Sequence, residues 1–116
     1  NSVYCSLENV KKNIESYCDN DLKKIIFVKG KVEETLNKND NIPQIISLLR
    51  LDTDFHDSIK KSLEILYPKL IKGGVLIIDD YGHFKGAKTA VDNFFKDKKK
   101  IWMHRIDYTC RLIIKP

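Results

Sequence analysis

Two apolar runs that each end in aspartate constrain the fold of this chain more than any other feature. Residues 44–51 (QIISLLRL) are followed by Asp52, and residues 75–78 (VLII) are followed by Asp79 and Asp80. Runs of this length, bounded by turn-forming residues, are typical of strands that a parallel sheet buries on both faces. We therefore expect two parallel strands whose carboxyl ends carry acids.

The clearest helical pattern lies between these runs, over residues 57–70, where apolar side chains recur every three or four positions. Asp57 or Ser58 is the expected N-cap of this helix. Gly73 and Gly74 are its expected terminators, because glycine adopts a positive φ at little cost. A helix between two such strands is typical of an α/β protein.

Other segments extend the alternation of helix and strand. The last two expected strands are joined by a short polar connection, which predicts an antiparallel hairpin. The sequence thus predicts one α/β domain with a mainly parallel sheet and an antiparallel pair at one side. The remaining expected elements are a helix from Ser6 to residues 19–21, a strand over residues 24–29, a short helix over residues 32–36, a loop over residues 37–43, a helix over residues 87–96, and strands over residues 101–106 and 110–115.

Composition argues against several classes of partner and site. The net charge is +5, but the lysines are interleaved with acids and form no continuous basic stripe, so nucleic-acid binding is not expected. No apolar run approaches the roughly 20 residues that span a bilayer, so no membrane segment is expected. The three cysteines have no CxxC spacing, which argues against a disulfide framework or a zinc site and favours reduced thiols in a cytoplasmic protein.

The acids at the two strand ends can act together if the strands are neighbours. Adjacent strands lie about 4.8 Å apart, so Asp52 can meet Asp79 or Asp80 at the edge where open α/β sheets bind ligands. Carboxylate oxygens favour magnesium, calcium or manganese over zinc. The alternative is that each acid is a turn or cap residue, which applies most to Asp54, close to the helix that starts near Asp57. Clustered carboxylates repel one another without a cation, which favours the metal site.

Four segments of the sequence resemble one known family. They are residues 6–17 (SLENVKKNIESY), 27–36 (FVKGKVEETL), 49–95 (with LDTD and GGVLIIDDYG) and 105–116 (RIDYTCRLIIKP). Together they resemble the TylF-like macrocin O-methyltransferases over nearly the whole chain. The resemblance implies a Rossmann-like class I methyltransferase fold, with helices on both faces of the sheet. It also implies an enzyme that uses S-adenosylmethionine and magnesium to methylate a hydroxyl of a sugar or other small secondary metabolite.

The family pattern implies roles for individual residues. It implies that magnesium is held by Asp52, Asp79 and Asp80, where the ion would lower the pKa of the acceptor hydroxyl. Asp52, or as a second candidate Asp54, is the expected general base for the hydroxyl proton. The residues expected to contact S-adenosylmethionine are Gly30, Lys31, Val32 and Asp52.

Some nearby residues stay open to more than one interpretation. The catechol O-methyltransferases, which carry a similar acid triad, have a lysine shortly after the first Asp, whereas Phe55 and His56 occupy that region here. The identity of the base is therefore open. His83 either touches the acceptor or faces solvent, and Tyr81 and Trp102 are expected to pack in the interior.

The sequence contains no glycine-rich loop of the kind with which such methyltransferases hold their cofactor. It therefore resembles the C-terminal half of the family domain. In the family strand order, 3-2-1-4-5-7-6, the two strands that this sequence lacks lie in the centre of the sheet. Their loss would separate residues 24–29 from residues 44–51 and expose an apolar edge. Either these two strands then pair directly, or two chains pair their edges as a homodimer. The alternative function is a catalytically incomplete module that self-associates or binds a partner, and a response-regulator-like domain is a weaker third reading.

Overall fold

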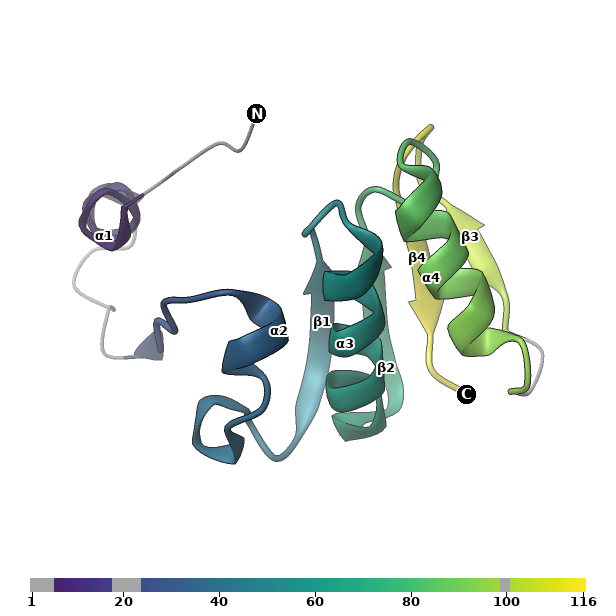
Figure 1. Ribbon diagram of the computed structural model, residues 1–116, viewed down its shortest axis with the longest axis horizontal. Helices are drawn as coiled ribbons and strands as arrows, with labels where there is room; N and C mark the ends of the chain where they lie inside the picture. Colours follow the sequence, from purple (N-terminus) through teal and green to yellow (C-terminus); the bar gives the residue numbers. More distant parts are fainter. Residues whose placement is uncertain (1–5, 18–23, 99–100) are drawn as a thin grey trace. The chain divides into compact units, whose positions relative to one another are not determined.

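The computed structural model describes residues 6–17, 24–98 and 101–116 of the chain (Figure 1). The chain divides into two compact units, Asn1–Gly30 and Lys31–Pro116. The first unit contains the helix α1 (Leu7–Tyr17). Ser6 caps it as expected, because its hydroxyl oxygen accepts a hydrogen bond of 3.2 Å from the backbone N–H of Asn9. The expectation of a single domain stays a prediction.

The strand expected over residues 24–29 is not present, and this prediction is wrong. Residue 24 belongs to a 3-10 turn, residues 25–29 have no regular secondary structure, and Ile26 is 85% exposed. Extended backbone becomes a strand only where a neighbouring strand completes its hydrogen bonds, and none of the described strands does so here. The expected end of the preceding helix, at residues 19–21, lies outside the described residues.

The second unit is built on a four-stranded sheet with the order β1-β2-β4-β3 (Figure 1). β1 and β2 are parallel, whereas β4 pairs antiparallel with both β2 and β3. The predicted parallel pair and the terminal antiparallel hairpin are therefore confirmed. The expectation of a mainly parallel sheet is wrong for the described strands, because two of the three pairings are antiparallel. The strands are β1 (Ile46–Leu51), β2 (Leu70–Ile78), β3 (Met103–Arg105) and β4 (Arg111–Ile114).

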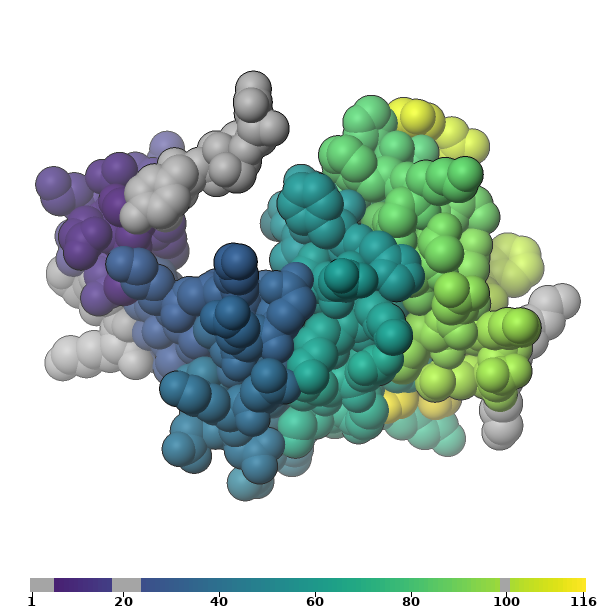
Figure 2. Space-filling view, in the orientation of Figure 1, coloured from purple at the N-terminus to yellow at the C-terminus, as the bar shows by residue number. Residues whose placement is uncertain are grey.

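Two helices of eleven residues each, α3 (His56–Leu66) and α4 (Lys85–Phe95), pack side by side on one face of this sheet. Figure 2 looks onto this helical side, where their side chains form a continuous surface. Shorter elements complete the described part of the unit. They are α2 (Val32–Thr35), the 3-10 turn η2 (Asn39–Asn41) inside the expected loop, and the 3-10 turn η3 (Tyr67–Lys69) after α3.

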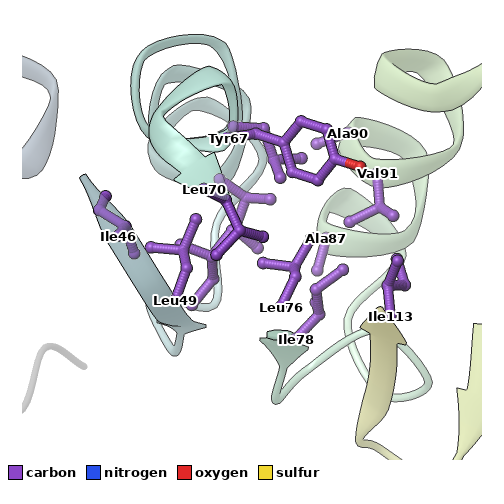
Figure 3. Packing of buried hydrophobic residues seen from close by; sticks show 13 residues of the cluster. Ile46, Leu49, Tyr67, Leu70, Leu76, Ile78, Ala87, Ala90, Val91 and Ile113 are labelled. Carbon is purple, nitrogen blue, oxygen red and sulfur yellow. The ribbon is translucent and has the colours of Figure 1, made fainter. Parts of the chain in front are cut away.

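The hydrophobic core lies between the sheet and these two helices (Figure 3). Leu76 and Ile78 of β2 and Ile113 of β4 have no exposed surface, and Ala87 and Val91 of α4 meet them with none of their own. Burying aliphatic side chains of this size stabilises the fold by about 1.5–3 kcal/mol each. Four further positions along α4 face this core: Ala90 and Val91 belong to it, and the partly buried Phe94 and Phe95 pack against it.

The expectation that both apolar runs are buried on both faces is wrong for β1. Leu48 is 61% exposed, whereas its neighbour Leu49 is 7% exposed. Successive side chains of a strand point to opposite faces, and α3 and α4 cover only one of them. Trp102, which was expected to be buried, is 73% exposed beside β3 for the same reason.

Gly73 and Gly74 were expected to terminate a helix, and instead they lie inside β2. The helix ends earlier, at Leu66, where Pro68 opens the 3-10 turn η3. Ile46 of β1 pairs with Leu70 of β2, and Leu48 pairs with Val75. β2 therefore contains extra residues between these two pairs and bulges there. Gly73 has a φ of 82° in this bulge, a conformation that suits glycine.

The expected N-cap of α3 is also wrong. The cap position is Phe55, which makes no side-chain capping bond, and neither Asp57 nor Ser58 occupies it. Ser58 is buried, and its hydroxyl donates to the Thr53 Oγ1 atom over 2.9 Å. The side chain of Ser58 therefore holds the loop after β1 against the first turn of the helix.

Candidate metal centre

The carboxyl ends of β1 and β2 lie at the same edge of the sheet. Leu51 is the register partner of Ile78, and the backbone N–H of Asp79 donates to the Leu51 carbonyl over 3.0 Å. This bond carries the parallel ladder one residue beyond the strands. The acids that follow the two strands are therefore neighbours, as the sequence predicts.

Three carboxylates meet at this edge. Asp52, Asp54 and Asp80 each offer one oxygen, and these oxygens all lie within 4.8 Å of one another. Asp52 is exposed, whereas Asp54 and Asp80 are half-buried. Carboxylate oxygens at this spacing are of the kind that bind a hard divalent cation such as Mg²⁺ or Ca²⁺.

Asp54 joins the cluster through an unusual backbone conformation. Its φ is 64°, which makes it the one non-glycine residue with a positive φ among those described. The backbone N–H of Phe55 donates to the Thr53 carbonyl over 2.7 Å, which closes a three-residue γ-turn centred on Asp54. A positive φ costs free energy for a residue other than glycine, and such strain concentrates at functional sites. The hydrogen bond between Ser58 and Thr53 anchors this turn to α3.

Asp80 is the least satisfied member of the cluster. Its Oδ2 atom is buried and has no hydrogen-bond partner. Burial, together with the hydrogen bonds and charges of the neighbouring Asp54 and Asp52, raises the pKa of this carboxyl to about 7. A buried carboxylate oxygen without a partner is costly, so this atom fits a cation or a proton.

Asp79 lies beside the cluster and has a different partner. The Arg50 Nη2 atom lies 3.7 Å from the Asp79 Oδ1 atom and 3.3 Å from the Asp52 Oδ2 atom. A hydrogen bond with Asp52 is the main cause that raises the pKa of Asp79, burial and the charge of Asp52 add to it, and Arg50 opposes it. Arg50 thus neutralises part of the charge on Asp52 and Asp79.

The structure brings together two of the three predicted metal ligands, Asp52 and Asp80, and adds Asp54 in place of Asp79. Asp54 was expected to have a secondary role, because its turn conformation cannot be recognised from the residue type. Arg50 was not predicted, although its position two residues before Asp52 on an extended segment is a signal that could have revealed it. The identity of the metal ligands stays a prediction.

Three of the four predicted cofactor residues fall where the first unit ends and the second begins along the chain. Gly30, with a φ of 138°, is the last residue of the first unit, and Lys31 begins the second. Lys31 is the N-cap residue of α2, and Val32 is the first residue of that helix. Their role in binding S-adenosylmethionine stays a prediction.

The loop between β2 and α4 is held against the hairpin turn between β3 and β4. The backbone N–H of Gly82 donates to the Thr109 carbonyl over 3.0 Å, and a Cβ atom at Gly82 would clash with the Tyr108 carbonyl oxygen. His83 is exposed, and its ring contacts Tyr108 at a centroid distance of 6.0 Å. Tyr81 packs against the core, in line with the expectation that it is a packing residue.

Comparison with known proteins identifies the family. The family model of macrocin-O-methyltransferase (TylF) matches residues 1–115. The chain belongs to the TylF family. Among curated relatives, demethyldecarbamoylnovobiocin O-methyltransferase of Streptomyces niveus is 35% identical over 96 residues, which cover 81% of this TylF-family chain and 35% of that protein. A tetracenomycin-C rhamnosyl 4'-O-methyltransferase of Streptomyces olivaceus is 38% identical over 89 residues, which cover 76% of the chain and 32% of that protein.

Solved structures agree with this assignment. The O-methyltransferase NovP superposes with a TM-score of 0.86 at 30% identity, over 95% of the TylF-family chain and 45% of NovP. The TDP-rhamnose 3'-O-methyltransferase CalS11 superposes with a TM-score of 0.69 at 20% identity, over 92% of the chain and 50% of CalS11, which supports the fold alone. The predicted Rossmann-like α/β methyltransferase fold is therefore confirmed. The TylF-family chain spans about a third of the length of the two curated relatives.

Features that bear on location and redox state are few. None of the helices in residues 6–17, 24–98 and 101–116 is long and apolar enough to cross a membrane. Cys110 is a free, half-buried thiol, while Cys5 and Cys18 lie outside the described residues. The cytoplasmic location stays a prediction.

Proposed function

We propose that this chain is part of an S-adenosylmethionine-dependent O-methyltransferase that methylates a hydroxyl of a sugar or small secondary metabolite, with a divalent cation that positions the acceptor. Family membership and the names of the relatives support the reaction class, since both curated relatives are O-methyltransferases and one has a rhamnosyl group in its name. The relatives are longer than this chain, so the complete reaction is a property of the complete enzyme.

The observation that carries the proposal is the buried, unpartnered oxygen of Asp80 among three carboxylates. A purely structural acid pair would be satisfied by a lysine, an arginine or backbone N–H groups. Arg50 lies near Asp52 and Asp79, and no hydrogen bond reaches the Oδ2 atom of Asp80. Asp52, Asp54 and Asp80 therefore fit a hard divalent cation, with magnesium as the first choice.

The chemistry divides between the cation and the acids. A divalent cation at such a site lowers the pKa of an acceptor hydroxyl and orients its oxygen. Asp52 and Asp54 are the candidates for the general base, because each can accept the proton of an acceptor held at the cluster. Arg50 holds Asp52 and Asp79 together and so positions the acid that follows β1. Residues Gly30, Lys31 and Val32, together with Asp52, are proposed to contact the methyl donor.

Isothermal titration of the chain with Mg²⁺ tests the metal centre and its ligand set. We expect Asp80→Asn to weaken binding by at least about tenfold, because it removes the charge of the carboxylate whose buried Oδ2 atom has no hydrogen-bond partner. Asp54→Asn and Asp79→Asn then discriminate between the two candidate sets. A larger loss in Asp54→Asn supports the set Asp52, Asp54 and Asp80, and a larger loss in Asp79→Asn supports the set implied by the family pattern. Wild-type affinity in Asp80→Asn would refute the metal centre.

A second titration with S-adenosylmethionine, with and without Mg²⁺, tests whether this chain holds the methyl donor. No heat and no thermal shift from either ligand would refute the enzymatic proposal for the chain by itself. The homodimer predicted from the exposed sheet edge and the catalytically incomplete module both stay predictions. Sedimentation at several concentrations measures self-association, and a monomer at every concentration would count against the homodimer.

A further inference from the structure

The residue after Asp80 is a tyrosine whose side chain joins the loop after β2 to α4 and to β4. The Tyr81 hydroxyl donates to the Asp92 Oδ1 atom of α4 over 2.7 Å, and the tyrosine packs against the core. Arg111, the first residue of β4, lies against the same ring, with its guanidinium carbon 5.0 Å from the ring centroid. Two elements therefore hold the side chain that follows Asp80.

Asp92 is a well-oriented acceptor for this hydroxyl, because a second donor holds it. The Lys88 Nζ atom, one turn earlier on α4, donates to the Asp92 Oδ2 atom over 2.7 Å. The same Nζ atom lies 5.4 Å from the centroid of the Tyr81 ring. Each oxygen of the carboxylate thus has its own donor. A hydrogen bond to an ionised acceptor is also stronger than one between neutral groups.

Arg111 connects the Tyr81 ring to the hairpin turn between β3 and β4. Its Nη1 atom donates to the Asp107 carbonyl over 3.0 Å and to the Cys110 carbonyl over 3.1 Å. Arg111 is also the register partner of Ile78, the last residue of β2. The hairpin turn and the start of α4 lie at the same end of the unit (Figure 1). Arg111 is half-buried, and a cation is attracted more strongly to an aromatic face where water is partly excluded.

Asp80 needs such support because like charges surround it. One of its carboxylate oxygens lies within 4.8 Å of oxygens of Asp52 and Asp54, and its buried Oδ2 atom has no hydrogen-bond partner. Carboxylates at this distance repel one another until a cation binds, so repulsion favours a rotation of Asp80 away from the cluster. The residue best placed to oppose this rotation is Tyr81, which α4 and β4 both hold.

We name Tyr81, Asp92 and Arg111 together the tyrosine clamp. We propose that the tyrosine clamp holds Asp80 among the other carboxylates against their repulsion and thereby prepares the cluster for a divalent cation. This inference deepens the proposed function and rests on its metal centre. Groups that orient metal ligands by direct hydrogen bonds change metal affinity by about 10–100-fold, and the clamp acts through the backbone, so its effect should be about three- to tenfold.

Isothermal titration of the chain with Mg²⁺ measures this effect. Tyr81→Phe removes the hydroxyl and keeps the ring, and it should weaken Mg²⁺ binding by about three- to tenfold. Tyr67→Phe is the matched control, because Tyr67 also packs in the core but precedes β2, at the end opposite the acids. Its affinity should stay within about twofold of the wild-type affinity. Wild-type affinity in Tyr81→Phe would overturn the proposal.

Arg111→Met separates positioning from simple electrostatics, because the two predict changes of opposite sign. Removing a positive charge from this edge of the sheet should by itself strengthen the binding of a cation. Loss of the clamp should weaken it, and we expect binding at least about threefold weaker than in the wild type. Tighter binding in Arg111→Met would contradict the positioning role. Thermal melting in EDTA checks that each variant is folded at the temperature of the titration.

A double-mutant cycle without cations tests the clamp independently of the metal centre. Asp80→Asn should raise the Tm in EDTA less in the Tyr81→Phe background than in the wild type, because a released Asp80 has already moved away from the other acids. An equal rise in both backgrounds would show that Tyr81 does not hold Asp80. Coupling in this cycle without any Mg²⁺ binding by the wild type would refute the metal centre and leave the clamp in place. Mg²⁺ binding that Tyr81→Phe leaves unchanged would refute the clamp alone.

Discussion

Replacing Asp80 by asparagine should have two effects of opposite sign. Asparagine has nearly the same shape as aspartate and carries no charge, so the substitution tests the charge of the cluster by itself. In the absence of divalent cations the variant should be more stable than the wild type. In their presence it should lose most of the stabilisation that a bound cation provides, because stabilisation by a ligand follows its affinity for the folded state.

The size of the first effect follows from the geometry. Two carboxylates at 4.8 Å repel each other by about 0.9 kcal/mol at the dielectric constant of water and by about 3.5 kcal/mol at an effective value of 20. Asp80 has two such neighbours, of which Asp52 is exposed and well screened, so the lower value is the better guide. Removing one charge at pH 8 therefore stabilises the fold by about 1–2 kcal/mol, which raises the Tm by about 5–15 °C.

Thermal unfolding followed by circular dichroism in EDTA and in excess Mg²⁺ measures both effects. Asp40→Asn is a suitable control, because Asp40 is an exposed acid in the turn η2 and lies outside the acid cluster. The control should respond to Mg²⁺ as the wild type does. A cation-free Tm of Asp80→Asn at or below the wild-type value would show that the acids do not repel one another, and the physical basis for the metal centre would be lost.

Three further predictions concern the same edge of the sheet and the core beneath it. Without divalent cations the stability of the wild type should fall as the pH rises from 3.8 towards 7, because the folded chain keeps a proton on Asp80 that the unfolded chain releases. Excess Mg²⁺, which binds the ionised carboxylates, should reduce this fall, and urea titrations across this pH range measure it. Gly82→Ala should destabilise by about 1–3 kcal/mol or displace the hairpin turn, because the added Cβ meets the Tyr108 carbonyl oxygen, and an unchanged Tm would contradict the packing there. Leu63→Ala, at a position with no exposed surface, should cost about 2–5 kcal/mol in the same urea titrations, and a loss below about 1 kcal/mol would argue against the core as described.

The parts of the fold that sequence predicts well are those in which a local pattern and a tertiary partner agree. Residues 44–51 and 75–78 have both, since each strand finds the other at its side. Residues 24–29 have a similar apolar composition and form no strand, because no described strand completes their hydrogen bonds. The prediction that Gly73 and Gly74 terminate a helix was wrong for a related reason. The helix ends before the turn that contains Pro68, and Gly73 lies in a bulge of the following strand instead.

Burial was predicted less well, because a sequence does not say what covers a strand. An apolar run fits a strand that is buried on both faces, and β1 has that composition. Its Leu48 is nevertheless 61% exposed, because it lies on the face of the sheet that α3 and α4 do not cover. The same argument applies to Trp102. Side chains that were predicted to be buried and are found exposed therefore mark the face of the sheet that α3 and α4 do not cover.

The acids show where the alternation of side chains along a strand stops predicting a site. Asp79 and Asp80 are consecutive residues of the turn that follows β2, beyond the last strand residue, Ile78. Asp79 interacts with Arg50 and Asp52. Asp80 lies with Asp52 and with Asp54, the residue at the centre of the γ-turn before α3. Asp52 interacts with both Asp79 and Asp80. A cation bound by Asp52 and Asp80 therefore has two candidates for its third carboxylate ligand, Asp54 and Asp79. Asp54 joins the cluster through a positive φ, which costs free energy in a residue other than glycine. Restoring an ordinary φ at Asp54 should therefore weaken cation binding even if all the carboxylates remain.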